Sequence, residues 1–148
     1  ANPGESLKPL EKVASGGEMS RIMLAFKAIA ANADSIPTLI FDEIDTGISG
    51  HIAAVVGEKM VSIADNHQVL CVTHLPQIAA LADVHFMVQK QDDGQTTRTS
   101  LKRLEMEERY EYIARMMSGM EDSKLAYEHA RELITHSEEI KQKRRKNK

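Results

Sequence analysis

Three acidic residues at the end of an apolar run are the first feature of this sequence that could do chemistry. The stretch TLIFDEIDTGISG, residues 38–50, places Asp42, Glu43 and Asp45 within four positions. Carboxylates this close repel one another unless something positive lies between them. In the Walker B arrangement of nucleotide hydrolases, such a strand delivers an acid to Mg²⁺, and Glu43 would then act on the attacking water. The alternative is a strand that ends in an ordinary solvated acidic turn.

A pair of glycines forms the second candidate site, within VASGGEMSR at residues 13–21. Ser15 and Glu18 fit the S-x-x-E capping box, so one interpretation is a well-capped helix start. The box does not explain Gly16 and Gly17, which lower helix stability. Paired glycines at a helix N-terminus allow backbone N–H groups to approach an anion, which indicates phosphate contact.

A histidine after an apolar run is the third candidate, within CVTHLPQIAA at residues 71–80. A single histidine such as His74 is often structural. Cys71 and His74 have C-x-x-H spacing, but no second ligand pair stands at the spacing of a zinc site. A Ser-His-Asp hydrolase would need a G-x-S-x-G motif, which the sequence lacks.

The apolar spacing predicts the elements that must position these residues. Helices alternate with buried strands, which indicates an α/β fold: a mainly parallel sheet with flanking helices and an edge hairpin. Residues 1–14 read as a loop. We predict helices over 17–32, 50–64, 75–82, 105–118 and from 123 onward, buried strands over 39–41 and 69–72, and a hairpin over 84–104 that turns at Asp93-Gly94.

The first two helices each have a predicted buried face, because apolar residues recur at three- and four-residue spacing. Both strands are apolar throughout, so each is expected to be covered on both sides. The predicted buried residues are Met19, Ile22, Met23, Phe26, Ile29 and Ala30 in the first helix and Ile52, Val56, Met60 and Ile63 in the second.

The charge is distributed unevenly along the 148 residues. The net charge is −3, but residues 141–148 hold six of the 19 basic residues and no acid. The other 140 residues carry 13 basic and 22 acidic residues, which disfavours non-specific DNA binding by this part. We therefore set residues 138–148 apart as a basic tail, expected to be a solvated helix end. No apolar run approaches eighteen residues and no signal pattern opens the sequence, so we expect a cytoplasmic protein without a membrane partner.

The three candidate sites, taken in this order, resemble the signature motif, the Walker B with its D-loop, and the switch histidine of ABC-type ATPases. The closer resemblance is to the SMC-like ATPases of DNA double-strand-break repair and recombination. It covers residues 1–137 and implies the C-terminal lobe of an ATPase head. The stretches that carry it are NPGE, SGGEMSRIMLAFK, FDEIDTGISG and THLPQIAALAD.

The resemblance implies a cofactor-binding group at the start of the first helix. Its residues are Ser15, Gly16, Gly17 and Glu18. The first three would contact the γ-phosphate of ATP held by an opposite protomer. On this basis we expect Gly17→Val to spare the fold and block association of two heads.

The resemblance also implies the roles of the acidic and histidine residues. Asp42 would bind Mg²⁺, through water, and Glu43 would be the general base. Asp45 would couple the two sites of a dimer, and His74 would sense the γ-phosphate.

One motif of the family is missing, since no G-x-x-x-x-G-K-[ST] occurs in these 148 residues. We therefore expect stable binding of ATP and Mg²⁺ to need an N-terminal lobe of the same head, and hydrolysis to need a second head as well. Contact with DNA, at the nucleoid, would come through the full-length protein, and this chain alone should expose an apolar patch. The alternative is an ABC-like dimerisation or partner-binding module that hydrolyses nothing.

Overall fold

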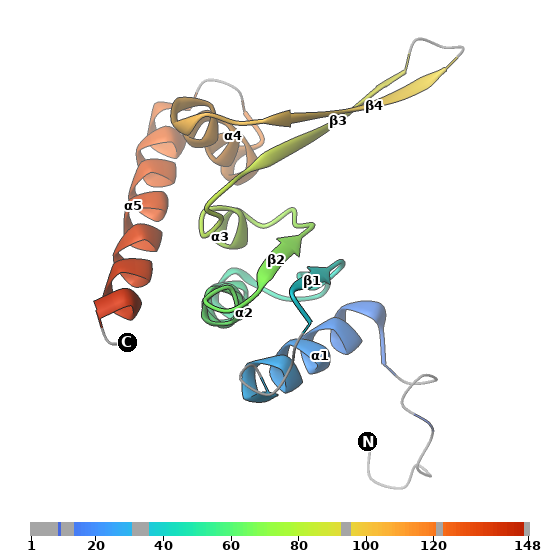
Figure 1. Cartoon of the computed structure of the whole chain (residues 1–148). Helices are drawn as coiled ribbons and strands as arrows, with labels where there is room; N and C mark the ends of the chain where they lie inside the picture. The colour runs from blue at the N-terminus through green and yellow to red at the C-terminus, as the bar shows by residue number, and fades with distance from the viewer. Residues whose placement is uncertain (1–8, 10–13, 31–35, 93–95, 121–122, 147–148) are drawn as a thin grey trace, which may run out of the picture. The chain divides into compact units, whose positions relative to one another are not determined.

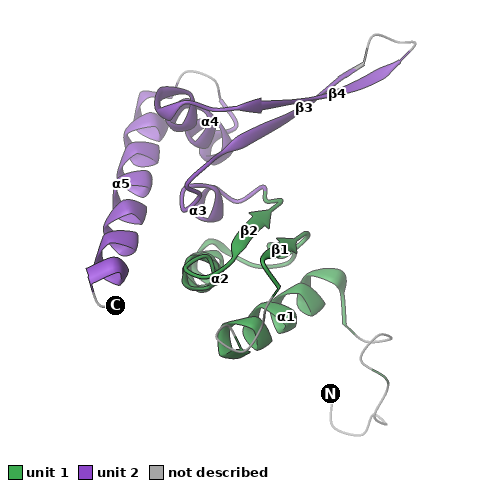
Figure 2. Ribbon diagram, viewed as in Figure 1, with its two compact units in different colours: residues 1–73 green, residues 74–148 purple. Residues whose placement is uncertain are grey.

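The computed structural model of the chain describes residues 9, 14–30, 36–92, 96–120 and 123–146 (Figure 1). Most of the predicted loop over 1–14 and all of the Asp93-Gly94 turn lie outside these residues. Contacts divide the chain into unit 1, residues 1–73, and unit 2, residues 74–148 (Figure 2). Helices combine with small sheets in the described residues, so the predicted α/β fold class is confirmed.

Unit 1 consists of two helices and two parallel strands. They follow the chain as α1 (Gly16–Ala30), β1 (Thr38–Phe41), α2 (Gly50–Ile63) and β2 (Gln68–Cys71). The strands pair in register from Thr38 with Gln68 to Phe41 with Cys71. Ligand-binding residues in parallel sheets follow the carboxyl ends of the strands, and the acidic turn begins directly after β1.

One face of the two-stranded sheet is exposed, as expected of this chain alone, and on the other face β1 is buried and β2 is half-buried. Leu39 and Phe41 are buried, whereas Ile40 between them is 70% exposed. Ile40 pairs with Leu70, and both Leu70 and Val72 are also exposed. Successive strand residues point to opposite faces, so the described residues cover one face and leave an apolar surface on the other.

The predicted buried face of α1 is also largely exposed. Met23, Phe26 and Ile29 are 47%, 63% and 85% exposed, while Gly17 and Leu24 are buried. Periodicity identifies the apolar side of a helix, but burial requires a second layer against it. The described residues therefore leave α1 with an apolar stripe, as expected for a chain that exposes an apolar patch.

Helix α2 matches its predicted stripe except at one position. Val56, Met60 and Ile63 are buried as predicted, but Ile52 is 44% exposed. The neighbouring Ala53 is fully buried instead.

Unit 2 contains the predicted hairpin and three helices. Its elements are α3 (Pro76–Ala79), β3 (Phe86–Asp92), β4 (Thr97–Arg103), α4 (Met106–Ser118) and α5 (Lys124–Lys146). Strands β3 and β4 are antiparallel and pair from Phe86 with Arg103 to Asp92 with Thr97. Among the described residues they form a two-stranded sheet of their own. Helix α4 begins in a capping box of Glu105 and Glu108 and ends at Gly119, whose φ of 67° suits a residue without a side chain.

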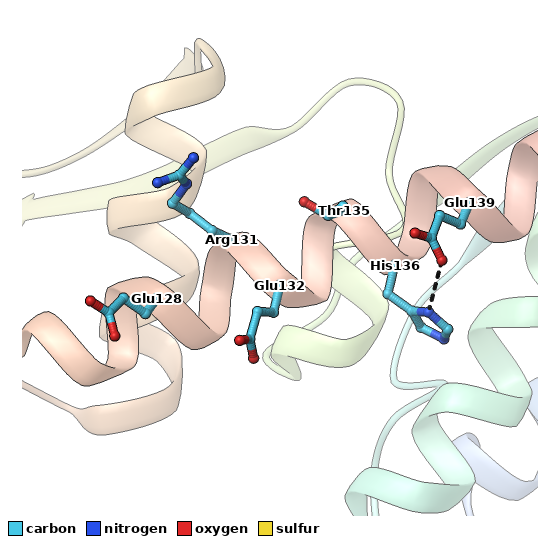
Figure 3. Close-up of a pocket in the computed structure, with 6 residues that line it drawn as sticks. All are labelled: Glu128, Arg131, Glu132, Thr135, His136 and Glu139. Atoms are coloured by element: carbon cyan, nitrogen blue, oxygen red, sulfur yellow. Dashed lines mark ion pairs between the residues drawn. The ribbon is translucent and has the colours of Figure 1, made fainter.

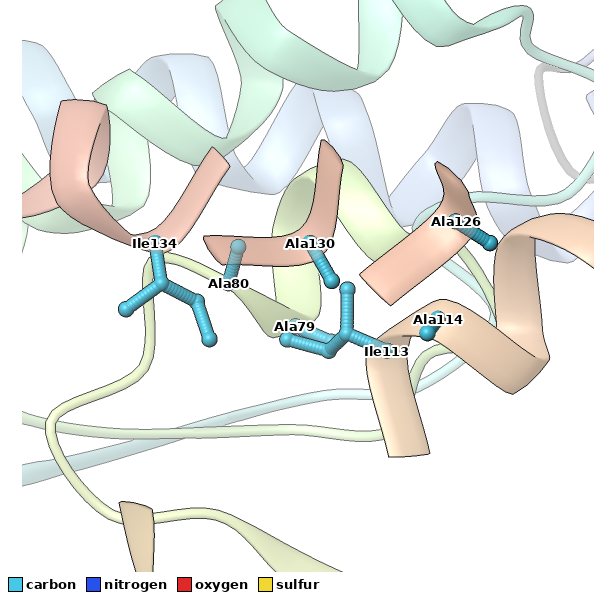
Figure 4. Packing of buried hydrophobic residues seen from close by; sticks show 7 residues of the cluster. All are labelled: Ala79, Ala80, Ile113, Ala114, Ala126, Ala130 and Ile134. Carbon is cyan, nitrogen blue, oxygen red and sulfur yellow. The ribbon is translucent and has the colours of Figure 1, made fainter. Parts of the chain in front are cut away.

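The core of unit 2 is built from α3, α4 and α5 (Figure 4). Five alanines let the helices approach one another closely, and Ile113 and Ile134 fill the space between them. The alanines are Ala79, Ala80, Ala114, Ala126 and Ala130.

The C-terminal helix α5 continues through the segment from residue 138 onward. Lys141, the first residue of the basic run, is 5% exposed rather than solvated. Its Nζ atom donates to Asp83 Oδ1 and Glu138 Oε1, each at 2.9 Å. Ser137 donates to the Ala80 carbonyl oxygen at 2.9 Å, so this part of α5 is fastened to the segment after α3. No described helix, α5 included, has the length and apolar character needed to cross a membrane.

Candidate functional site

The N-terminus of α1 is closed by the predicted capping box. The Ser15 N–H donates to Glu18 Oε2 at 2.8 Å, and the Glu18 N–H donates to Ser15 Oγ at 3.3 Å. The backbone hydrogen bond from Ser15, followed by the bond from its hydroxyl, lowers the pKa of Glu18. Local capping therefore accounts for both residues.

The glycine pair allows α1 to approach the acidic turn closely. A Cβ atom on Gly17 would lie 2.7 Å from the Glu43 carbonyl oxygen and 3.1 Å from Thr46 Cβ. A Cβ atom on Gly16 would meet the end of the Glu43 side chain, 2.5 Å from Oε2. The expectation that Gly17→Val spares the fold is therefore wrong, because a backbone atom occupies the space.

The two glycines should respond differently to substitution by alanine. Gly17→Ala drives Cβ against backbone, and overpacking of this kind costs about 1–3 kcal/mol. Gly16→Ala meets a flexible carboxylate and gains helix propensity, so its free energy of unfolding should stay level or rise by up to about 1 kcal/mol. Urea denaturation followed by circular dichroism measures both variants. Equal stabilities would contradict the packing role of Gly17.

The three acids of the turn occupy different environments. Asp42 and Glu43 are exposed, and the Glu43 N–H donates to Asp42 Oδ1 at 2.9 Å. Asp45 is 4% exposed and accepts a hydrogen bond from Thr73 Oγ1 at 2.6 Å. Two carboxylates thus face solvent, and the third is held inside by the Thr73 hydroxyl.

The backbone of Glu43 has an unusual conformation. Its φ is 55°, in the left-handed region that side chains other than glycine rarely adopt. The Thr46 N–H donates to the Glu43 carbonyl oxygen at 3.0 Å and closes the turn. Strained residues of this kind cluster at functional sites and are held there by their surroundings.

The environment of Cys71 argues against a thiolate at neutral pH. Burial, then the charges of Asp45 and Asp42, raise the pKa of the thiol to about 12.

Comparisons with known proteins identify the relatives of this chain. No family model matches it. It is 50% identical over 140 residues to the DNA repair protein RecN of Halalkalibacterium halodurans, which covers 95% of the chain. The RecN proteins of Bacillus subtilis and Deinococcus radiodurans are 47% and 52% identical over 141 and 134 residues, or 95% and 90% of the chain. The chain is homologous to the C-terminal part of RecN.

The alignment with RecN covers most of this chain but only a small part of each relative. The chain spans about a quarter of each: 25%, 24% and 23% of the three RecN proteins named above. Three quarters of a RecN protein therefore has no counterpart in these 148 residues.

Within this RecN-like chain, unit 1 brings together two of the three predicted groups. The residues of the signature-like motif lie beside the acidic turn, as the contacts of Gly16 and Gly17 with Glu43 show. His74 is the first residue of unit 2, and its side chain is exposed. The site roles of all three groups stay predictions.

Sequence reasoning missed the polar residues that hold the acidic turn. Ser20 and Arg21 on α1 donate to its carbonyl oxygens, and Thr73 donates to Asp45. Only their positions in the sequence could have indicated this role. Ser20 and Arg21 follow the glycine pair by one helical turn, and Thr73 follows a strand.

A pocket on α5 contains none of the predicted site residues (Figure 3). It is lined by six exposed residues from successive turns of one helix face: Glu128, Arg131, Glu132, Thr135, His136 and Glu139. The His136–Glu139 ion pair is 3.8 Å long. The pocket is therefore built from one element only, apart in sequence from the three predicted groups.

The residues of the acidic turn could supply part of a metal site. Asp42 is an exposed carboxylate after β1, as Mg²⁺ binding would require. The described residues contain no group of three or more His, Cys, Asp and Glu that could hold a metal ion. Asp42 could therefore supply one ligand, with the others coming from elsewhere.

Proposed function

We propose that this chain is the C-terminal lobe of an ATPase head in a RecN-like DNA repair protein. Its lobe boundary would lie near residue 137. The head would hydrolyse ATP only when this lobe is joined to an N-terminal lobe and paired with a second head. On this proposal the 148 residues alone are inactive.

One observation carries the proposal: the glycine pair lies against the acidic turn. Gly17 can approach the Glu43 backbone only because it has no Cβ atom. The N-terminus of α1 is the positive end of a helix dipole, and Gly16 at its start is exposed. A helix start with an exposed glycine and two exposed carboxylates thus lie in one small region, in a chain related to RecN.

The proposed roles follow the chemistry of each residue. Asp42 would bind Mg²⁺ through water, and Glu43 would accept a proton from the attacking water at its carboxylate. Asp45 would couple the two sites of a dimer of heads from its buried position against Thr73. His74, exposed at the start of unit 2, would sense the γ-phosphate. Bound Mg²⁺ would supply charge neutralisation of the phosphates.

The exposed apolar surfaces of unit 1 support an N-terminal lobe as partner. Ile40 and Leu70 on the sheet, and Phe26 and Ile29 on α1, are all large and exposed. A parallel sheet ordinarily has both faces covered, and the RecN relatives contain the additional length that cover requires. Contact with DNA would come through the full-length protein, in the cytoplasm at the nucleoid.

Thermal unfolding with and without millimolar Mg-ATP tests the proposal. The full-length protein should be stabilised, since a ligand at about 100 times its Kd adds about 2.7 kcal/mol. This chain alone should keep its melting temperature, because most of the nucleotide site lies elsewhere.

Each half of that comparison can overturn the proposal. A rise of several degrees for the isolated chain would reveal a nucleotide site of its own and contradict the split head. An unchanged melting temperature for the full-length protein would favour the alternative, a dimerisation or partner-binding module that binds through the exposed stripe of α1.

A further inference from the structure

Two side chains of α1 hold the acidic turn by its backbone. Ser20 Oγ donates to the Asp42 carbonyl oxygen at 2.9 Å. Arg21 Nη1 donates to the carbonyl oxygens of Ile44 at 3.0 Å and Thr46 at 2.9 Å. The accepting carbonyls belong to every second residue of the turn, one before Glu43 and two after it. We call Ser20 and Arg21 the carbonyl clamp.

The clamp is built into the contact between α1 and the turn. A Cβ atom on Gly17 would lie 3.1 Å from Arg21 Nη1, so the absence of a side chain at Gly17 leaves room for the guanidinium. The planar guanidinium directs one nitrogen at two carbonyls, which a flexible ammonium does less well. Both acceptors of Arg21 are neutral carbonyl oxygens, so its hydrogen bonds fix the position of the turn and do not form an ion pair.

Glu43, which lies between the carbonyls of Asp42 and Ile44, has the backbone conformation that requires support. Glu43 has a φ of 55°, and a residue in this conformation returns to a more common one unless neighbouring contacts prevent it. The carbonyl of Asp42 before it and that of Ile44 after it are both fixed by α1. Rotation about the Glu43 backbone would break at least one of these bonds.

We propose that Arg21, assisted by Ser20, is a positioning residue that holds Glu43 in its left-handed conformation and couples α1 to the acidic turn. This inference rests on the proposed function, in which Glu43 is the general base. A displacement of about 1 Å at a catalytic group can cost about a hundredfold in rate, so loss of the clamp should slow hydrolysis without preventing nucleotide binding.

The test uses the full-length protein with Arg21→Ala and Arg21→Lys. Arg21→Ala should lower kcat about tenfold to a hundredfold and leave KM within about threefold. Arg21→Lys retains one donor group and should recover part of the loss. Arg98→Ala is the matched control, since it removes the same charge from an exposed position on β4 and should leave kcat unchanged.

Two further measurements separate positioning from general destabilisation. Amide hydrogen exchange over residues 42–47 should accelerate in Arg21→Ala and stay unchanged in Arg98→Ala. In single turnovers, Arg21→Ala should add little to the defect of Glu43→Gln, because both changes act on one group.

The possible results distinguish this inference from the function on which it rests. Wild-type kcat and exchange in Arg21→Ala, beside an inactive Glu43→Gln, would overturn the clamp and leave the proposed function standing. An equal loss from Arg21→Ala in both backgrounds would also overturn it. Full activity of Glu43→Gln would overturn the proposed function, and the exchange measurement would still decide whether the clamp exists.

Discussion

The Glu43→Gln variant of the full-length protein should lose steady-state ATP hydrolysis while it still binds ATP. Removal of a positioned general base costs about 10² to 10⁴ in rate, and glutamine retains the size and shape of the side chain. The substitution also relieves the repulsion between two exposed neighbouring carboxylates, so folding stability should not fall. Phosphate release measures turnover, and a fluorescent nucleotide measures binding.

Asp45→Asn is a second variant to compare with Glu43→Gln, because Asp45 belongs to the same turn but is buried and has the proposed coupling role instead. Its Oδ2 accepts the Thr73 hydroxyl, so this substitution disturbs packing and coupling rather than proton transfer. Turnover by Glu43→Gln at the wild-type rate would remove Glu43 from the mechanism. Loss of nucleotide binding in the same variant would assign Glu43 to affinity instead of catalysis.

Ile113→Ala should give the largest loss of folding stability, about 2–5 kcal/mol. Ile113 is fully buried in α4, where it packs against the alanines of α3 and α5. Those alanines are already the smallest side chains that can fill such a position, so the neighbouring helices cannot move in to close the cavity without backbone shifts. Urea denaturation of the chain, followed by circular dichroism, measures the change.

Leu125→Ala is the matched control for this core substitution. Leu125 lies at the start of α5 and is 65% exposed, so its truncation should cost well under 1 kcal/mol. If the two variants unfolded at the same urea concentration, the α3–α4–α5 cluster would not be the core that stabilises unit 2.

The type and order of the elements could be predicted from the sequence because they depend on local signals. The capping box of Ser15 and Glu18 begins α1 as predicted, and α4 ends at Ser118, the last residue of the predicted helix 105–118. Hydrophobic spacing located the strands and α2 to within a few residues. These signals act between residues a few positions apart, so a single sequence contains them in full.

Burial could not be predicted in the same way. Ile40 and Phe26 are as apolar as their buried neighbours, yet both are exposed. Lys141 is charged and belongs to a basic run, yet it is buried and forms an ion pair with the exposed Asp83. Apolar character states what a side chain prefers, whereas burial depends on whether another layer packs against it.

The candidate site shows the same division between sequence and tertiary structure. The sequence by itself determined which residue types were available: a glycine pair at a helix start, and Asp42, Glu43 and Asp45 after a strand. Only the tertiary structure decided that the glycines contact Glu43, that Asp45 alone is buried, and that Arg21 holds the turn between them. Each of these contacts joins residues more than twenty positions apart, so each depends on how the chain packs rather than on any local pattern.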